Sequence, residues 1–354
     1  MKELLQQIRP PDESARQEAR RRWNACMKPL GSLGLLEKAL EDIAALTGSA
    51  DIFLRERAAL VLCADNGVVA QGVTQCGSDM TAIVARNLAA GVTSVCRMAA
   101  EAGCRVVPVD MGILDFPGAE GVLSCRIANG TGDISQGPAM TRAEAEQAVL
   151  AGVELVREQK RQGVRLLATG EMGIGNTTTS SAVASVLLGR PAVEMTGRGS
   201  GLSDEGLSRK IHAIEQAVAV NRPDPADPID VLAKVGGLDL AGLCGVFLGG
   251  ALYQVPVLLD GFISSTAALC ALRLCPNAGK AMLASHVSAE PAARYVLEAL
   301  GKEPLITAGM RLGEGTGAVA AMPLLDMARA VYASGYTFDG CGVEPYQPLG
   351  GFTT

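Results

Sequence analysis

The feature that most constrains the fold is a short apolar run that recurs along the chain and is followed each time by a helical pattern. These runs cover residues 58–63, 104–109, 164–168 and 255–259, and a shorter fifth run begins at Leu305. Strands that are apolar along their whole length are buried on both faces, as in a parallel sheet flanked by helices. The sequence therefore predicts an α/β fold with a doubly wound, mostly parallel, Rossmann-like sheet.

The chain is long enough for one large α/β unit accompanied by a smaller one, because it has 354 residues. Residues 1–48 show a helical pattern that a glycine closes, so we expect them to form the N-terminal part of a small helical domain. We expect the α/β core to span 49–324. Residues 325–354 are expected to complete the small domain and to end in a tail rich in glycine and proline.

Composition excludes several classes of function. Aromatic residues make up 3% of the chain and the net charge is −6, which argues against a nucleic-acid partner. The N-terminus lacks the apolar stretch of a signal peptide, and the most apolar region, 238–275, contains Pro256 and Asp260 and predicts buried elements instead of a membrane span. Ten cysteines without a CxxC pair and only two histidines argue against zinc. We expect a cytoplasmic protein that needs no metal.

A carboxylate, two glycines and a polar helix start follow the third apolar run. Glu171 stands at the expected strand end, and Gly173 and Gly175 allow the backbone to bend and to approach a ligand closely. Asn176 and the threonines after it can cap the next helix and offer its free N–H groups to an anion. This pattern indicates a site for a phosphorylated ligand that carries hydroxyl groups.

A second glycine-rich loop, 311–318, places Glu314 between glycines. A partly buried carboxylate has a raised pKa and can act as a general base near neutral pH, although a solvated loop carboxylate fits the local sequence equally well. For Glu171, a ribose-binding role and a helix-capping role are equally consistent with the sequence. Lys210 follows a glycine-rich segment, as a phosphate-binding cation would, but an exposed helix lysine is the more common case.

Motifs for other reaction classes are missing. GxxxxGK[ST] and GxSxG are absent, and no cysteine has a histidine nearby in the sequence, which disfavours a P-loop NTPase and a hydrolase. The segment GIGNTT lacks the third glycine of a dinucleotide fingerprint, which disfavours a Rossmann dehydrogenase.

Together, the motifs resemble the nicotinate-nucleotide–dimethylbenzimidazole phosphoribosyltransferases of cobamide lower-ligand assembly. In that family an aromatic base displaces nicotinate from the anomeric carbon of nicotinate mononucleotide and gives an α-ribotide, without metal or cofactor. The resemblance covers nearly the whole chain, in order: KPLGSLG at 28–34, ADNGVVAQGV at 64–73, NGTGDISQGPAMT at 129–141, GEMGIGNTTTSSA at 170–182, DVLAKVGGLDLAGLCG at 230–245, VPVLLDGFISSTAAL at 255–269, SHVSAEP at 285–291 and MRLGEGTGAVAAMP at 310–323.

The resemblance implies roles for particular residues. It implies that Glu314 is the general base and that Glu171 lies near the ribose and the reaction centre. The residues implied in nucleotide binding are Gly173, Gly175, Asn176, Thr177, Thr178, Lys210 and Ser288. Those implied in binding the aromatic base are Asn66, Cys76, Met80, Val84 and Leu312.

The chain departs from the family pattern where the aromatic base is expected to bind. Asn66 stands in place of a histidine, and Cys76 and Val84 occupy positions where the dimethylbenzimidazole enzymes tend to carry Ser and Gln. A less polar pocket favours an acceptor with fewer ring heteroatoms, because fewer buried polar groups need partners. We therefore expect phenol or p-cresol as acceptors beside benzimidazoles.

The family resemblance also implies an assembly. We expect a homodimer, or a heterodimer with a paralogous chain. The main alternative to an active enzyme is a catalytically silent paralogue that binds nucleotide and serves as a partner subunit, although the presence of both Glu171 and Glu314 argues against it.

Overall fold

A computed structural model describes residues 1–199 and 201–347, and its centre is a parallel sheet. The strand order in this described part is β3-β2-β1-β4-β5-β6. The strands are β1 (Arg57–Ala64), β2 (Arg105–Gly112), β3 (Leu123–Ser124), β4 (Leu166–Met172), β5 (Val257–Leu259) and β6 (Met282–Ala284). The chain builds outward from β1 to β3 and then returns to β4 on the other side of β1. The strand order therefore reverses between β1 and β4, and ligands bind at such a point in open α/β sheets.

The two faces of the sheet belong to two separate apolar cores, which confirms the predicted doubly wound α/β fold. Side chains of β1 alternate between them: Ala58, Leu60 and Leu62 enter one core, and Ala59, Val61 and Cys63 enter the other. Because neither face meets water, every residue of this strand is buried. A half-exposed strand would instead show alternating polar residues.

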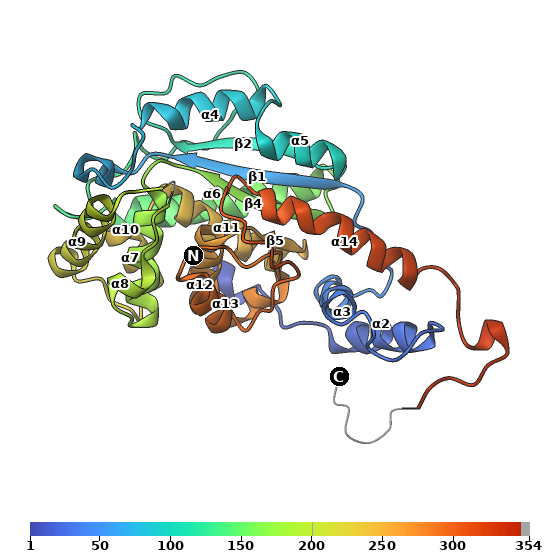
Figure 1. The fold of residues 1–354 in the computed structure, drawn as a ribbon. Helices are drawn as coiled ribbons and strands as arrows, with labels where there is room; N and C mark the ends of the chain where they lie inside the picture. The colour runs from blue at the N-terminus through green and yellow to red at the C-terminus, as the bar shows by residue number, and fades with distance from the viewer. Residues whose placement is uncertain (200, 348–354) are drawn as a thin grey trace.

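Helices cover both faces of the sheet (Figure 1). The first core contains side chains of α6 (Arg142–Arg161), α11 (Leu238–Tyr253) and α12 (Phe262–Leu274). The second contains side chains of α4 (Asp79–Ala89), α5 (Ser94–Glu101) and α14 (Thr316–Tyr332). Further helices are α1 (Lys2–Gln6), α7 (Asn176–Leu188), α8 (Ala192–Met195), α9 (Asp204–Asn221), α10 (Pro228–Val235) and α13 (Ala293–Leu300), with short 3-10 turns at Gly67–Gln71, Pro276–Ala281 and Asp339–Cys341.

Glycines let α6 and α11 pack with their backbones in contact. A Cβ atom on Gly152 would meet the carbonyl oxygen of Gly242, and one on Gly245 would meet that of Val149. This close packing explains why α11 is rich in glycine although glycine is a poor helix former. The helix is buried through nearly its whole length, and its start presents Asp239 to the carboxyl end of the sheet.

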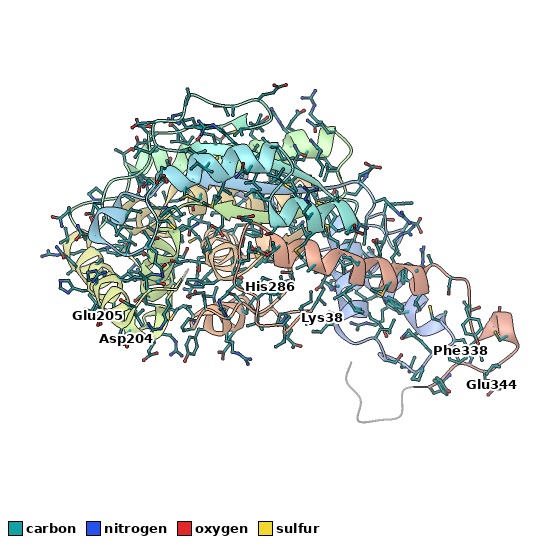
Figure 2. All side chains as sticks on the ribbon, turned by 45° about the horizontal axis from the view of Figure 1, so that its top comes forward. Lys38, Asp204, Glu205, His286, Phe338 and Glu344 are labelled. Atoms are coloured by element: carbon teal, nitrogen blue, oxygen red, sulfur yellow. The ribbon has the colours of Figure 1, made fainter. Side chains whose placement is uncertain are left out.

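The helices at residues 13–25 and 35–47 lie beside the end of α14 (Figure 1). α2 (Glu13–Ala25) packs on α3 (Leu35–Thr47), and the ring centroids of Trp23 and Tyr332 are 5.0 Å apart. Figure 2 shows Phe338 and Glu344 at one end of the molecule, far from His286 near its centre. The division into domains at 48 and 324 remains a prediction.

Two strand assignments differ from the expectation. The predicted strand at Leu305 was wrong. In the described residues the last strand is β6, and Ile306 forms only an isolated bridge with His286. β6 directly follows a 3-10 turn and is three residues long. A strand this short does not stand out in the sequence as an apolar run. β3 is shorter still and exposed, so it gave no signal.

Two further observations concern the described residues. All ten cysteine side chains in residues 1–199 and 201–347 are free thiols. None of the helices described there combines the length and the apolar character needed to cross a membrane.

Candidate functional site

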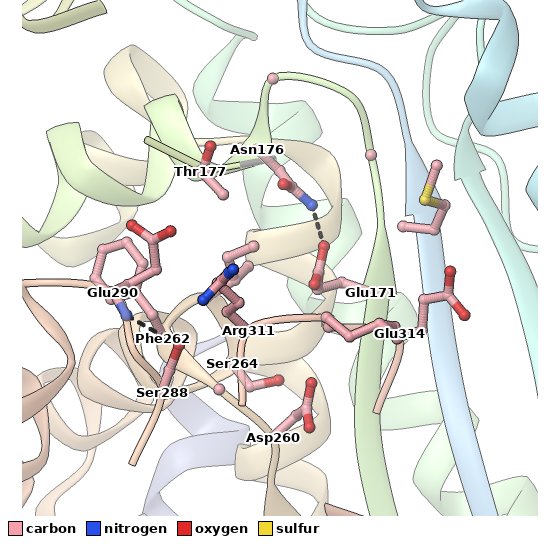
Figure 3. A pocket seen from close by; sticks show the side chains of 18 of the residues that line it. Glu171, Asn176, Thr177, Asp260, Phe262, Ser264, Ser288, Glu290, Arg311 and Glu314 are labelled. Carbon is pink, nitrogen blue, oxygen red and sulfur yellow. Dashed lines mark hydrogen bonds between the residues drawn. The ribbon is translucent and has the colours of Figure 1, made fainter. Parts of the chain in front are cut away.

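A cavity of about 240 Å³ opens where the loops after the central strands come together (Figure 3). Its walls come from the loops after β4, β5 and β6 and from the loop before α14. Figure 3 shows Thr177, Ser288 and Glu290 on one side, Glu171 and Glu314 on the other, and Arg311 between them. The cavity therefore lies at the carboxyl ends of the strands, where the sheet topology places ligands.

The turn between β4 and α7 brings the backbone close to β1. A side chain at Gly173 would meet the carbonyl oxygen of Ala64. Gly175 has a φ of 91°, a left-handed conformation that glycine adopts without strain, and it precedes α7. No side chain caps α7, so the positive end of this helix faces the cavity wall formed by Gly175, Asn176 and Thr177.

Glu171 and Asp239 share one amide group at the acidic side of the cavity. The Nδ2 atom of Asn176 donates to a carboxylate oxygen of Glu171 and, at 3.2 Å, to Oδ2 of Asp239. Burial raises the pKa of Glu171 well above its usual range, and Asp239 raises it further. Burial also raises the pKa of Asp239, to about 6.

Glu314 adopts a left-handed backbone conformation, which favours glycine. Its φ is 59°, between Gly313 at 87° and Gly315 at 91°. The loop presses on β4, since a Cβ atom on Gly170 would lie 2.5 Å from the carbonyl oxygen of Glu314. A strained residue of this kind persists where the surrounding structure holds it, often at a functional site.

Glu314 lines the cavity, and its carboxylate has no hydrogen-bond donor among the described residues. Its Oε2 atom is buried and has no partner among the described residues. Burial raises the pKa of Glu314, and the nearby Asp260 raises it further. Asp260 accepts hydrogen bonds from the backbone N–H groups of Gly315, Gly317 and Ala318, and so fixes the start of α14 directly after Glu314.

Lys210 approaches the opposite side of the cavity from α9. It is fully buried, although the sequence alone favoured an exposed lysine, and burial lowers its pKa to about 8. Its Nζ atom donates to Oγ1 of Thr177 at 2.7 Å and to the carbonyl oxygen of Gly197 at 3.1 Å. Arg198 and Arg311 line the same cavity, and so does Glu290, whose carboxylate partly offsets the effect of burial on the pKa of Lys210.

The structure brings most of the residues implied in catalysis and nucleotide binding to this cavity. Lining residues from that set are Glu171, Gly173, Gly175, Asn176, Thr177, Lys210, Ser288 and Glu314. Thr178 is fully buried in α7 and does not line the cavity.

The residues implied in binding the aromatic base are more dispersed. Leu312 lines the cavity and is 54% exposed. Asn66 is buried behind the wall, where it donates to the carbonyl oxygen of Ile174. Cys76 is exposed on the loop before α4, and Met80 and Val84 are partly buried on α4; none of the three lines the cavity.

Sequence reasoning missed several lining or supporting residues. Val73 and Thr74 line the cavity from the segment that precedes Cys76. Asp260 had a signal, because it follows an apolar run and precedes a glycine. Asp239 gave no such signal in the sequence, because it lies in an apolar helical stretch.

Comparisons with known proteins agree along nearly the whole chain. A phosphoribosyltransferase family model matches residues 8–343. The nicotinate-nucleotide–dimethylbenzimidazole phosphoribosyltransferase of Acetivibrio thermocellus is 48% identical and covers 93% of each chain. The enzyme of the same name from Ruminiclostridium cellulolyticum is 46% identical over 98% of this chain and 99% of its own. The crystal structure of CobT from Thermus thermophilus matches with a TM-score of 0.89 at 40% identity, over 94% of this chain and 99% of its own. The chain therefore belongs to the nicotinate-nucleotide–dimethylbenzimidazole phosphoribosyltransferase family.

Proposed function

We propose that this enzyme transfers the phosphoribosyl group of nicotinate mononucleotide to an aromatic base and releases nicotinate and a proton. The observation that carries the proposal is one cavity with the buried cation Lys210 on one side, called the cationic side although Glu290 also lines it, and the carboxylates of Glu171 and Glu314 on the other. The relatives' names, which specify nicotinate nucleotide and dimethylbenzimidazole, support the same two substrates.

The nucleotide's phosphate binds at the cationic side. Lys210, Thr177 and Ser288 supply a charge and two hydroxyl groups there, and the positive end of α7 adds to the attraction. The ribose then extends toward Glu171, which places the anomeric carbon between the two sides. The glycines at 173 and 175 let this turn pack closely on Ala64 and Asn66, which brings the turn's backbone to the cavity wall beside the sugar.

Glu314 acts as the general base in this proposal. The bond between the anomeric carbon and the pyridinium nitrogen breaks, its electron pair leaves with nicotinate, and a nitrogen or oxygen of the acceptor forms the new bond. The proton that the acceptor loses passes to the Glu314 carboxylate. Its raised pKa and its lack of a protein donor suit a group that must accept a proton near neutral pH.

The acceptor range extends to phenol and p-cresol in this proposal. The ring enters beside Val73, Thr74 and Leu312, where apolar groups line the cavity. α4, with Val84, packs against β4 behind this region. A phenol offers one oxygen and needs fewer polar partners than a benzimidazole, and its O–H, with an ordinary pKa of about 10, requires a base such as Glu314.

We also infer that the chain functions in the cytoplasm and assembles as a homodimer or with a paralogous chain. Exposed apolar side chains on α14 and on the segment after it support association: Met327, Val331, Tyr336, Val343 and Tyr346. Ten free thiols in the described residues are consistent with a reducing compartment.

The test is a chromatographic assay of purified protein with nicotinate mononucleotide and either dimethylbenzimidazole or phenol. We expect an α-ribotide from both acceptors, and loss of both products in Glu314→Gln. Glu298→Gln, an exposed carboxylate on α13, is the matched control and should retain activity.

The outcomes separate the parts of the proposal. Product from dimethylbenzimidazole alone refutes the extended acceptor range and keeps the transferase. Binding of nicotinate mononucleotide without any product identifies a silent partner subunit. Absence of binding refutes the proposed substrate.

A further inference from the structure

Asn176 joins two buried carboxylates that come from different elements. Glu171 lies at the end of β4 and is 7% exposed, and Asp239 lies at the start of α11 and is fully buried. The Asn176 amide donates one hydrogen bond to each. Two carboxylates in one buried site seldom both carry a charge, because the repulsion between them is little screened.

The two carboxylates are supported unequally. Oδ1 of Asp239 also accepts the backbone N–H of Leu240 at 2.9 Å, and the start of α11 favours a negative charge through the helix dipole. Among the described residues Glu171 accepts a hydrogen bond from Asn176 alone. A single proton shared by the pair therefore belongs on Glu171.

Most titratable groups around the pair add to this preference. Glu171 faces Asp260 after β5, Glu314 before α14 and Cys63 on β1, and Asp239 faces Asp65 after β1. Within residues 1–199 and 201–347, no lysine or arginine forms an ion pair with Glu171 or Asp239. The cations Lys210 and Arg311 line the same cavity, and Lys210 is held by Thr177 and Gly197.

We propose that Asp239, positioned against Glu171 by Asn176, keeps a proton on Glu171 in the empty site, and that Glu171 releases it when the nucleotide binds with its pyridinium nitrogen near this carboxylate. The inference rests on the proposed substrate, whose pyridinium ring carries a positive charge. That charge favours the ionised carboxylate and opposes the effect of Asp239. The O–H bond of Glu171 breaks, the proton goes to the solvent, and no other bond changes. Asp239 is a positioning residue here, since it touches Glu171 only through Asn176.

The test measures protons released on binding nicotinate mononucleotide, without acceptor, by titration calorimetry in buffers of different ionisation enthalpy from pH 5.5 to 8.5. The phosphate and Lys210 also exchange protons, but they do so in every variant. We expect the wild type to release up to one proton more than Glu171→Gln. Release is also small at high pH, where Glu171 is already ionised in the empty site. In Asp239→Asn, the midpoint at which the extra release falls to half its maximum on this high-pH side should move lower by about one unit or more, because the repelling charge is gone.

Two further variants keep the test decisive. Asn176→Ala removes the donor that favours ionised Glu171, so its midpoint should move to higher pH, opposite to that of Asp239→Asn. Asp110→Asn is the matched control, a buried aspartate at the end of β2 that pairs with Arg126, and should leave the midpoint unchanged.

The refuting results are distinct. A midpoint in Asp239→Asn equal to or above that of the wild type overturns the role of Asp239, and undiminished release in Glu171→Gln overturns the role of Glu171. If the wild type does not bind nicotinate mononucleotide, the proposed substrate fails, and the inference fails with it. None of these readouts depends on turnover.

Discussion

Replacing Glu314 with glycine should make the protein more stable while it abolishes transfer. The residue has a φ of 59° between two glycines that also have positive φ. Glycine adopts this conformation freely, whereas a residue with a Cβ atom is strained in it. The variant also removes a carboxylate whose Oε2 atom is buried and unpartnered among the described residues.

The gain can be estimated from these two effects. Relief of the left-handed conformation contributes about 1–2 kcal/mol to the free energy of unfolding, and removal of the half-buried carboxylate contributes about 1 kcal/mol. The greater freedom of glycine in the unfolded chain subtracts about 0.4–1 kcal/mol. The net gain is about 1–2.5 kcal/mol. For 354 residues at about 2.1 cal/mol/K each, this raises the Tm by about 2 °C.

Thermal unfolding of matched variants separates strain from charge. Gln254→Gly is the control for strain, because Gln254 has a φ of 55°, is exposed at the end of α11 and carries no charge. Its Tm should rise by about 0–2 °C, less than that of Glu314→Gly, since strain relief and the entropy of glycine oppose each other and no charge is removed. Glu314→Gln keeps the strained backbone and should show only the part of the gain that comes from the charge.

The pH dependence has a definite sign. Burial raises the pKa of Glu314, so the folded state binds more protons than the unfolded state between the usual carboxyl pKa and the raised one. Stability from this group therefore falls as pH rises through that window, and the gain in Glu314→Gly should be larger at pH 7.5 than at pH 4.5. A Tm of Glu314→Gly that lies 2 °C or more below the wild type, or transfer activity that survives, would refute the reasoning.

Two other predictions concern the same cavity. Lys210→Met should raise the KM for nicotinate mononucleotide about 10- to 100-fold, with a smaller effect on kcat, because a charge-assisted bond worth about 1.5–3 kcal/mol is lost. Initial-rate measurements test this. The affinity of the wild type for the nucleotide should weaken above pH 8, since the pKa of Lys210 is about 8. Gly170→Ala should lower kcat at least about tenfold, because its Cβ atom would lie 2.5 Å from the carbonyl oxygen of Glu314 and displace the loop. Gly137→Ala, where a Cβ atom meets nothing within 4 Å, is the control for that variant and should behave as the wild type in rate and in Tm.

The fold was predictable where local pattern and tertiary environment agree. β1, β2 and β4 are apolar and buried for most of their length, so their sequence alone predicts a strand. β6 is three residues long, and its strand character comes from pairing with β5, which a local pattern does not contain. The prediction at Leu305 failed for the converse reason. The run is locally apolar, but in the fold it forms only one β-bridge, between Ile306 and His286.

The site was predictable where a residue type carries its own signal. Glu171 and Glu314 stand in glycine-rich turns, and the structure brings both to one cavity. Lys210 looks like an ordinary helix lysine, and only tertiary packing against Thr177 and Gly197 buries it. Asp239 lies on an apolar helix, and its contact with Asn176 joins residues 63 positions apart, which no local spacing reveals.

Three unfavourable features lie around one cavity. Lys210 is buried without an acidic partner within ion-pair distance in the described residues, two carboxylates share the Asn176 amide, and Glu314 is strained and unpartnered. A ligand with an anionic phosphate at one end and a positively charged pyridinium nitrogen on the far side of its ribose relieves the first two costs when it binds. The nucleotide does not relieve the backbone strain at Glu314, which only a residue such as glycine would remove. A glutamate retained at that position is therefore best explained by what its carboxylate does in the reaction.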